Sequence, residues 1–417
     1  MAKTMAQLPY HYGVKVRVFP STEQKRLIKR NSDASRFIYN QMNGMNNDLF
    51  WLKQVKIPIA IVLDRIVDLT ERLKKPSTAI SNIHGWLNHP DFDSLMKANA
   101  IKNYKTAWKL FRQVHQAGTP KFHKRGYTQT YQTSCLYGVK VMTPAMNNGS
   151  VRLTDFHHLW LPKLGRLRFK GFPSKLLSRA DDVRVGTTTV SMDAVGHYFV
   201  SLQLGSAQPF VGKQKVAKSK AGIDLNLDNF LTDSNGQVIA NPRYYRMIKG
   251  TLAKAQRKLA RRARRAKKSQ RRLSESKNYQ KQRLLVVKLQ LKVANQRKNF
   301  LHHISTTLIK NHDLVVAEEL RSKNMLRNHA LAMSIADVGW RTLLGMLAYK
   351  ADLYGRKFLT VNPRNTTQTC SHCGYIMTGK NKLTLADRKW TCPSCGVFHV
   401  RDHNAAKNIL AKGLATL

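Results

Sequence analysis

The sequence has few acidic residues for its length, with 23 Asp and Glu against 72 Lys and Arg in 417 residues. The formal net charge is +49 at pH 7. A chain with so large an excess of one charge repels itself when it folds, so it is expected to face a polyanion. Nucleic acid is the leading candidate for that partner, and an anionic membrane surface is the weaker one.

Long hydrophobic runs are also missing. The longest apolar stretch, IPIAIVL at 57–63, ends at Asp64 and is too short to span a bilayer. The N-terminal segment contains no apolar core of the length that a signal peptide needs. Because 42% of the residues are hydrophobic, the chain still has enough apolar side chains for two or three folded domains. We therefore expect a soluble, intracellular protein that handles nucleic acid.

Cysteine is scarce, with five residues, but four of them lie within the last fifty positions in the pattern C-x2-C-x18-C-x2-C. Each C-x2-C turn directs two thiolates at one ion, so the spacing predicts a zinc site. Four thiolates leave no open coordination position, which makes this zinc structural, with His372 and His399 as alternative ligands. Cys135 stands alone and is expected to be a small buried apolar residue. The predicted zinc ligands are Cys370, Cys373, Cys392 and Cys395.

The first half of the chain predicts a helical block next to β-structure. Residues 12–19 alternate polar and apolar side chains as a strand does, and Ser21 with Gln24 forms the capping-box pattern of a helix start. Helical periodicity continues to about residue 115. Residues 127–210 are short alternating runs broken by glycine, which predicts antiparallel hairpins in a small barrel that the first strand joins. Aromatic residues expected to build the helical core are Phe37, Tyr39, Phe50, Trp51, Trp108 and Phe111.

The second half predicts an α/β layout. Asn235-Gly236 is the strongest hairpin signal between two or three short strands in 221–240. The other elements expected after the basic linker 212–220 are one long helical stretch over 249–311, a buried strand over Leu314–Leu320, a helix from about Ile335 to Tyr354 and a strand at 357–361.

The long helical stretch is strongly basic, with Lys or Arg at 18 positions between Lys254 and Lys298 and only Glu275 opposing them. A solvated charged face is the usual explanation of such a run. Because pairing within the helix cannot balance this charge, we favour contact with nucleic-acid phosphates, and affinity should fall steeply with salt. The residues expected to make that contact are Lys254, Arg257, Lys258, Arg261, Arg262, Arg264 and Arg265.

Three carboxylates at the ends of predicted elements are candidate metal ligands. Asp224 lies in an apolar strand, Glu318 and Glu319 end the next clear strand, and Asp402 opens the terminal helix. Each alone is weak evidence, because an Asp or Glu at the end of a strand is more often a cap or a surface charge. Together they could converge, and converging carboxylates repel one another unless they share a cation. Oxygen ligands suit Mg²⁺ or Mn²⁺, and two such ions can hold the attacking and leaving oxygens of a phosphodiester.

The order of these acids around the zinc pattern resembles the TnpB proteins of bacterial and archaeal insertion sequences, relatives of type V CRISPR effectors. The resemblance covers nearly the whole chain. The specific part comprises AGIDLNLDNFLTDSNG, VVAEELRSKNM, NTTQTCSHCG and VRDHNAAKNIL, which resemble the three nuclease motifs and the zinc ribbon. The looser part comprises VRVFPSTEQKRLI, SRFIYNQMN, GTPKFHKRG and LWLPKLGRLRF, which resemble the N-terminal and middle blocks.

The resemblance implies an RNA-guided DNA endonuclease whose catalytic acids are Asp224, Glu318 and Asp402, with Mg²⁺ or Mn²⁺ as the catalytic metal. The family usually has Asp-Arg-Asp at the last motif, and Val400 replaces the first Asp here, which is not the expected metal ligand. Arg401 and Asn404 fit the motif and would orient the substrate or the Asp402 carboxylate. Arg401 is also expected to contact nucleic acid.

The implied fold class is α/β with β-barrel and helical lobes: a RuvC-like nuclease domain of RNase H fold, an inserted four-cysteine zinc ribbon, and an N-terminal wedge-type β-barrel with a helical recognition insertion. The implied partners are guide RNA and target DNA, with no membrane, in the prokaryotic cytoplasm at the nucleoid. A monomer with its RNA is expected, and a dimer is the alternative. The implied domains are the barrel at 1–20 and 121–211, the recognition lobe at 21–120, the nuclease domain at 212–365 and 399–417, and the ribbon at 366–398.

Three other functions fit the same resemblance. A nuclease-inactive, RNA-guided repressor would be expected to lose acids of the triad, and all three are present. An auxiliary transposition protein is a second alternative, and a small type V CRISPR effector is a third that differs mainly in its RNA partner. For the nuclease, the short segment between the last Cys pair and Asp402 predicts that the zinc ribbon holds this carboxylate in position.

Overall fold

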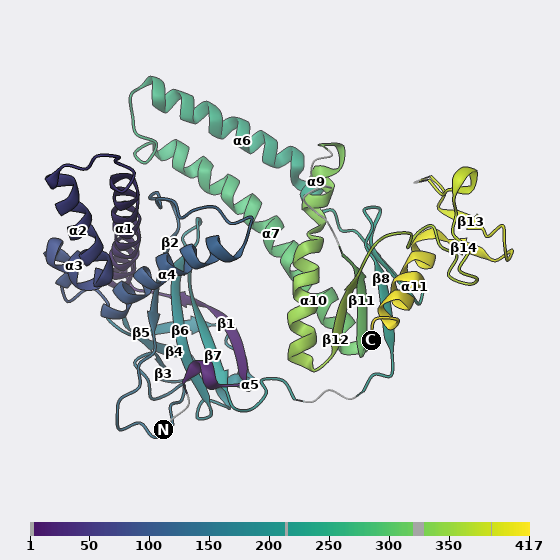
Figure 1. The fold of residues 1–417 in the computed structure, drawn as a ribbon, viewed down its shortest axis with the longest axis horizontal. Coiled ribbons are helices and arrows are strands. Elements are labelled where there is room, and N and C mark those ends of the chain that lie inside the picture. Colours follow the sequence, from purple (N-terminus) through teal and green to yellow (C-terminus); the bar gives the residue numbers. More distant parts are fainter. Residues whose placement is uncertain (1–3, 213–215, 320–328, 385) are drawn as a thin grey trace. The chain divides into compact units, whose positions relative to one another are not determined.

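The computed structural model describes residues 4–212, 216–319, 329–384 and 386–417. At 329–332 and 336 it describes the backbone alone. Two compact units divide the chain, Met1–Phe210 and Val211–Leu417. Figure 1 colours the first unit from purple to teal and the second from teal to yellow. The finer division into barrel, recognition lobe, nuclease domain and ribbon stays a prediction.

The first unit contains the expected helical block. Its first helix, α1 (Thr22–Leu52), begins at the predicted capping box: Ser21 Oγ accepts from the Gln24 N–H at 3.2 Å, and Gln24 Oε1 accepts from the Ser21 N–H at 2.9 Å. Gln24 Nε2 also donates to the carbonyl of Leu164 at 2.8 Å, which ties the helix start to the neighbouring sheet. The following helices are α2 (Ala60–Lys74), α3 (Pro76–Ile83), the 3-10 turn η2 (Gly85–Asn88) and α4 (Ser94–Gln113).

The helical core contains only some of the aromatic residues expected in it. Tyr39 packs edge-on against the buried ring of Tyr104, with 5.3 Å between ring centroids. Phe50 and Trp51 are 57% and 69% exposed. Both lie in the last turn of α1, so the expectation that they are core residues is wrong.

A seven-stranded antiparallel sheet completes the first unit, in the order β2-β6-β7-β1-β5-β4-β3. The first strand joins it between β7 and β5, as predicted. No pairing between described residues joins the edge strands β2 and β3, so the pairings give an open, curled sheet, and closure into a barrel stays a prediction. The strands are β1 (Tyr10–Phe19), β2 (Gln129–Ser134), β3 (Arg152–Leu153), β4 (His158–Leu161), β5 (Gly165–Lys170), β6 (Val183–Met192) and β7 (Tyr198–Ser206), and the short helices are η1 (Met5–Gln7) and α5 (Ser174–Leu177).

The second unit is built on a five-stranded sheet in the order β10-β9-β8-β11-β12, in which β8, β11 and β12 are parallel. The predicted Asn235-Gly236 hairpin is confirmed: Gly236 has φ +86°, and Asp233 Oδ1 accepts from the Asn235 N–H at 2.9 Å. The predicted strand end at Leu320 and linker residues 213–215 lie outside the described residues. The strands are β8 (Lys220–Asp224), β9 (Asn229–Asp233), β10 (Val238–Ala240), β11 (Leu314–Glu318) and β12 (Lys357–Val361).

Two stretches of this unit that were each predicted to be one helix are interrupted. The stretch 249–311 forms two helices, α6 (Tyr244–Lys268) and α7 (Lys277–Asn311), because the chain leaves α6 at Gln270, which has φ +52°. The helices lie side by side (Figure 1), and Gln282 Nε2 donates to the Ala255 carbonyl at 3.0 Å. Gly339, at φ +70°, likewise separates α9 (His329–Val338) from α10 (Trp340–Tyr354).

The terminal helix, α11 (Arg401–Leu414), packs directly on the sheet through two glycines. A Cβ on Gly222 of β8 would lie 2.2 Å from the Ala406 carbonyl, and one on Gly413 would lie 2.5 Å from Val316 of β11. Ala405, Ala406 and Ile409 are fully buried and form the apolar face of this helix. This close approach places the N-terminal turn of α11 beside the strands that carry the other candidate acids.

Candidate active site

The parallel pairing of β8 and β11 brings Asp224 and Glu318 to the same edge of the sheet. Ile223 is paired with Ala317, and each acid is the next residue on its strand. Strand ends of this kind are where α/β sheets present ligand-binding side chains. The placement of these two acids is therefore set by the register of two strands that lie far apart in the sequence.

The carboxyl group of Asp224 has a strongly raised pKa. Burial raises its pKa to about 7, and the charges of Glu318 and Asp402 add to the effect. The nearby amide of Asn226 and the charge of Arg401 act in the opposite direction. Because the charges of both other acids act on Asp224, the three carboxyl groups share one electrostatic environment.

Glu318 is held by a residue that the sequence analysis missed. The buried hydroxyl of Thr366 donates to Glu318 Oε1. Burial raises the pKa of Glu318, against the effects of this hydrogen bond and of Lys412. Thr366 lies in the NTTQTC block just before Cys370, so its place beside the zinc pattern was the available signal.

Asp402 lies in the first turn of α11, where the helix dipole favours a negative charge. Its side chain is 14% exposed, and its Oδ1 is 3.5 Å from Arg401 Nε and 4.0 Å from Arg388 Nη1. Arg388 also pairs with Asp228. Arg388 lies outside every recognised motif and 160 residues from Asp228, so no sequence pattern indicates its place beside these acids.

The donor set fits a divalent cation, although the carboxylates are not gathered around one point. Among the described residues, the group of potential ligands drawn within 4.8 Å of one another consists of four cysteines and includes none of these acids. Asp224 is buried and its pKa is raised by the charges of the other two acids, and neighbouring carboxylates of this kind repel one another unless they share a cation. Asp224, Glu318 and Asp402 are the side chains that would hold such an ion.

The four cysteines are brought together as the sequence predicted, in the segment 366–398 that contains β13 (Lys389–Thr391) and is called the zinc ribbon below after the metal expected there. The Cys370 and Cys395 sulfurs are 3.7 Å apart, and so are those of Cys373 and Cys392. With Zn–S bonds of about 2.3 Å, neighbouring thiolates of a tetrahedral site lie about 3.8 Å apart, so the geometry fits zinc. His399 Nε2 is 3.1 Å from the Cys370 sulfur, which makes it a hydrogen-bond partner of that ligand.

The zinc ribbon and α11 are joined by covalent and hydrogen bonds. Strand β14 (Phe398–Val400) ends at the residue before α11. Asn404 accepts from the Ser371 N–H at 2.8 Å and donates to the Thr369 carbonyl at 2.7 Å, and Asn408 donates to the same carbonyl at 2.6 Å. These contacts fasten the helix that carries Asp402 to the first cysteine turn.

Two residues of the last motif, which were expected to orient the substrate or the Asp402 carboxylate, are largely buried. Asn404 is buried, and both ends of its amide are bonded to the zinc ribbon. The Arg401 side chain is only 10% exposed and donates to the Thr384 carbonyl at 3.0 Å. The Arg401 Nε lies 3.5 Å from Asp402 Oδ1, and the contact with nucleic acid expected of Arg401 stays a prediction.

Most of the basic residues expected to contact phosphates are exposed on α6. Arg262 is partly buried, and its Nη1 donates to the Asn278 carbonyl at 2.6 Å. The exposed members are Lys254, Arg257, Lys258, Arg261, Arg264 and Arg265. Because α7 covers the opposite side of the helix through Leu252 and Val286, the charges form a solvent-facing surface.

Three family models match parts of the chain. The OrfB_IS605 model, described as "Probable transposase", matches residues 206–329, and the model described as "Cas12f1-like, TNB domain" matches 340–409. A model described as "Helix-turn-helix domain" matches 11–48, where the structure has strand β1 followed by helix α1. No helix among the described residues is long and apolar enough to cross a membrane.

Curated proteins with related sequences have consistent names. A "Putative RNA-guided DNA endonuclease" of Streptomyces pristinaespiralis is 37% identical over 230 residues, which are 55% of this chain and 53% of that protein. The chain thus spans about half of that relative's length. A "Putative RNA-guided DNA endonuclease InsQ" of Escherichia coli K12 is 28% identical over 97% of this chain and 92% of its own.

One solved structure has the same overall fold. The chain of the "Cas12f1-sgRNA-target DNA complex" aligns over 96% of this chain and 98% of its own, with a TM-score of 0.54 and 14% sequence identity. At that identity the similarity concerns the fold alone. The matching models and the named relatives agree with the resemblance to the TnpB family that the sequence motifs indicate.

Proposed function

We propose that this protein is an RNA-guided, metal-dependent DNA endonuclease with a RuvC-like active site formed by Asp224, Glu318 and Asp402. The observation that carries the proposal is the placement of Asp224 and Glu318 at the same edge of the sheet, where the charges of Glu318 and Asp402 act on Asp224. Guide RNA would pair with the target strand, so that sequence is recognised by base pairing and the protein recognises backbone shape and a flanking motif. The names of the relatives support this assignment.

The chemistry follows from what the carboxylates can hold. Bound Mg²⁺ or Mn²⁺ would polarise the phosphodiester and activate the attacking water. Asp224 must first lose the proton that its raised pKa of about 7 favours. Thr366 would keep Glu318 in one orientation by its hydrogen bond, and the positive charge of Arg401, with Nε 3.5 Å from Asp402 Oδ1, would attract the Asp402 carboxylate.

Arg388 has a place in the same scheme. Its side chain is 47% exposed, and it lies between Asp228 and Asp402. A guanidinium in this position can bind a phosphate oxygen of the DNA backbone, because its fork of N–H donors matches that group. It would then hold the scissile phosphate beside the metal-binding carboxylates.

Cleavage of a plasmid by the protein with its copurified RNA and Mg²⁺ tests the proposal. Asp402→Asn should abolish cleavage while RNA binding persists, since the substitution removes a metal ligand and little volume. Asp352→Asn is a matched control, because Asp352 is an exposed acid of α10 in the same unit. Equal cutting by the Asp402 variant and the parent would refute the active site. The absence of any discrete copurified RNA would favour an auxiliary role in transposition.

A further inference from the structure

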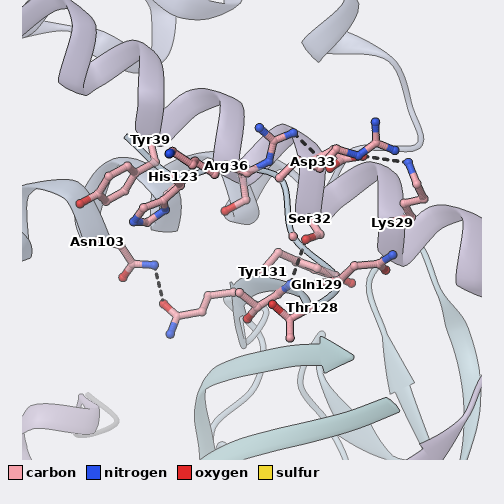
Figure 2. Close-up of a pocket in the computed structure, with 17 residues that line it drawn as sticks. Lys29, Ser32, Asp33, Arg36, Tyr39, Asn103, His123, Thr128, Gln129 and Tyr131 are labelled. Carbon is pink, nitrogen blue, oxygen red and sulfur yellow. Dashed lines mark hydrogen bonds and ion pairs between the residues drawn. The ribbon is translucent and has the colours of Figure 1, made fainter. Parts of the chain in front are cut away.

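The first unit contains a polar cavity of about 440 Å³ that no catalytic motif occupies. Helix α1 contributes one wall and β2 another, and the segment 123–128 closes a third side (Figure 2). Part of that segment belongs to the block GTPKFHKRG, which has no chemical role in the proposed reaction.

The backbone of this segment is firmly attached to α1. The His123 imidazole stacks on the Tyr39 ring, with 3.9 Å between centroids and 11° between planes. Asn40 accepts from the His123 N–H at 2.8 Å and donates to its carbonyl at 3.0 Å. Figure 2 shows the stacked rings at one end of the cavity. The neighbouring Lys124 and Arg125 are thereby presented from a fixed backbone.

The cavity carries an excess of positive charge. Lys29, Arg36, Lys124 and Arg125 line it, and Asp33 is the one carboxylate among its lining residues. Asp33 is already paired with Lys29 at 2.9 Å and Arg36 at 3.3 Å. Lys124 and Arg125 have no such counter-charge among the lining residues, so the cavity favours an anionic ligand.

The cavity also has an unused hydrogen-bond acceptor. Gln129 Oε1 is buried and has no hydrogen-bond partner among the described residues. The backbone beside Gln129 is held in place, because the next residue, Thr130, donates its N–H to Ser32 Oγ at 2.9 Å. A buried acceptor without a donor is costly, so a ligand that supplies an N–H or O–H group is favoured here.

We propose that this cavity binds one unpaired nucleotide of a nucleic-acid strand, with a base N–H donated to Gln129 and the phosphate held by Lys124 and Arg125. The inference rests on the proposed function for the presence of a nucleic-acid partner. A phosphate ion alone would leave most of the volume empty and the Gln129 acceptor unpaired. An acidic peptide side chain supplies the charge but no donor of its own.

Photo-crosslinking of the full-length protein tests this assignment. Short single-stranded oligonucleotides containing 4-thiouridine in RNA or 4-thiothymidine in DNA are bound and irradiated, and the modified peptides are mapped by mass spectrometry. We expect crosslinks at Tyr39 or His123 in one arm, which identifies the strand as RNA or DNA. Gln129→Leu should lower the yield by about fivefold or more, because it removes the buried acceptor.

Charge removal gives a second, independent variant. Lys124→Ala with Arg125→Ala should lower the same yield by about tenfold, since two phosphate contacts are lost. Both residues are exposed, so this variant is expected to fold even if Gln129→Leu does not. Lys140→Ala with Lys175→Ala is the control, because it removes the same charge from exposed positions of the same unit that do not line this cavity.

Three outcomes would overturn the proposal. The first is oligonucleotide binding without crosslinks in the cavity, and the second is an equal loss of crosslink yield in the charge variant and its control. The third is displacement of the oligonucleotide from the cavity by poly-glutamate at matched charge. The assay is separate from DNA cleavage. Cleavage without crosslinks in the cavity would refute this site and leave the nuclease assignment intact. Crosslinks in the cavity of a protein that never cleaves DNA would support this site and refute the nuclease assignment.

Discussion

Asp224 is buried beside two other carboxylates, and both features make its ionised form unfavourable in the metal-free protein. Its pKa is raised from an ordinary 3.8 to about 7. Between these values the folded state binds a proton that the unfolded state releases. The stability gained from that proton is complete below about pH 4 and is lost as the pH rises through about 7.

A side chain that cannot ionise should escape this loss. We expect the melting temperature of Asp224→Asn, relative to the parent, to rise steadily between about pH 4 and pH 7 and then to level off, in buffer without added Mg²⁺. Thermal unfolding followed by circular dichroism at each pH measures the difference. Asp352→Asn should show no comparable trend, and a pH-independent difference for Asp224→Asn would contradict the assigned pKa.

At the scale of single elements, the contact between α11 and β8 depends on the absence of a side chain at Gly222. An added Cβ would meet the backbone carbonyl of Ala406 at 2.2 Å, so the whole helix would have to move. Gly222→Ala should destabilise the protein by about 1–3 kcal/mol, as overpacking does. Cleavage should fall as well, because Asp402 lies on the displaced helix.

Urea unfolding and plasmid cleavage measure the two effects of Gly222→Ala. Gly250→Ala is a matched control, because Gly250 lies within α6 and a Cβ there would meet nothing within 4 Å. That control should be neutral or more stable by up to about 1 kcal/mol, as expected for alanine in a helix. Parent-like stability of Gly222→Ala would show that α11 does not pack as described.

The exposed surface of α6 makes a second prediction at this scale. Replacing four of its cations by glutamine, Lys254, Lys258, Arg261 and Arg265, should reduce the salt dependence of nucleic-acid binding. The slope of log K against log salt is negative, and each lost phosphate contact makes it shallower by about 0.7–0.9. Titrations at several salt concentrations measure this slope.

The control for α6 removes the same charge from exposed lysines of the first unit, at Lys25, Lys109, Lys140 and Lys175. If binding depends on contacts along α6, the control should retain a steeper slope than the α6 variant. Equal slopes would mean that the effect comes from the total charge of the protein and not from this helix.

For the molecule as a whole, we expect the zinc ribbon and the candidate active site to depend on each other. The helix that carries Asp402 is bonded to the first cysteine turn through Asn404 and Asn408. Removal of zinc should therefore abolish most of the cleavage even with Mg²⁺ restored, although zinc takes no part in the reaction. Re-addition of zinc or Cd²⁺ should recover it, and hydrogen exchange should show loss of protection in α11. Full cleavage by zinc-free protein would contradict this coupling.

Some features of this protein could be predicted from sequence because they depend on neighbours in the chain. The Ser21 capping box, the Asn235-Gly236 turn and the cysteine spacing each involve a few consecutive positions or a repeated short turn, and all three are confirmed. Continuity of helices was harder, because the break at Gln270 depends on a left-handed backbone that no residue preference indicates.

The sequence by itself determined the charge, the four-cysteine cluster and the ends of strands at which the acids lie. Only the tertiary structure decided which side chains contact those acids and their neighbours. Thr366 reaches Glu318 across 48 residues, and Arg388 reaches Asp228 across 160. It also decided that Phe50 and Trp51 are exposed and Arg401 is buried. Burial and electrostatic interactions depend on distance in space, and the packing of α11 and the zinc ribbon against the sheet sets those distances.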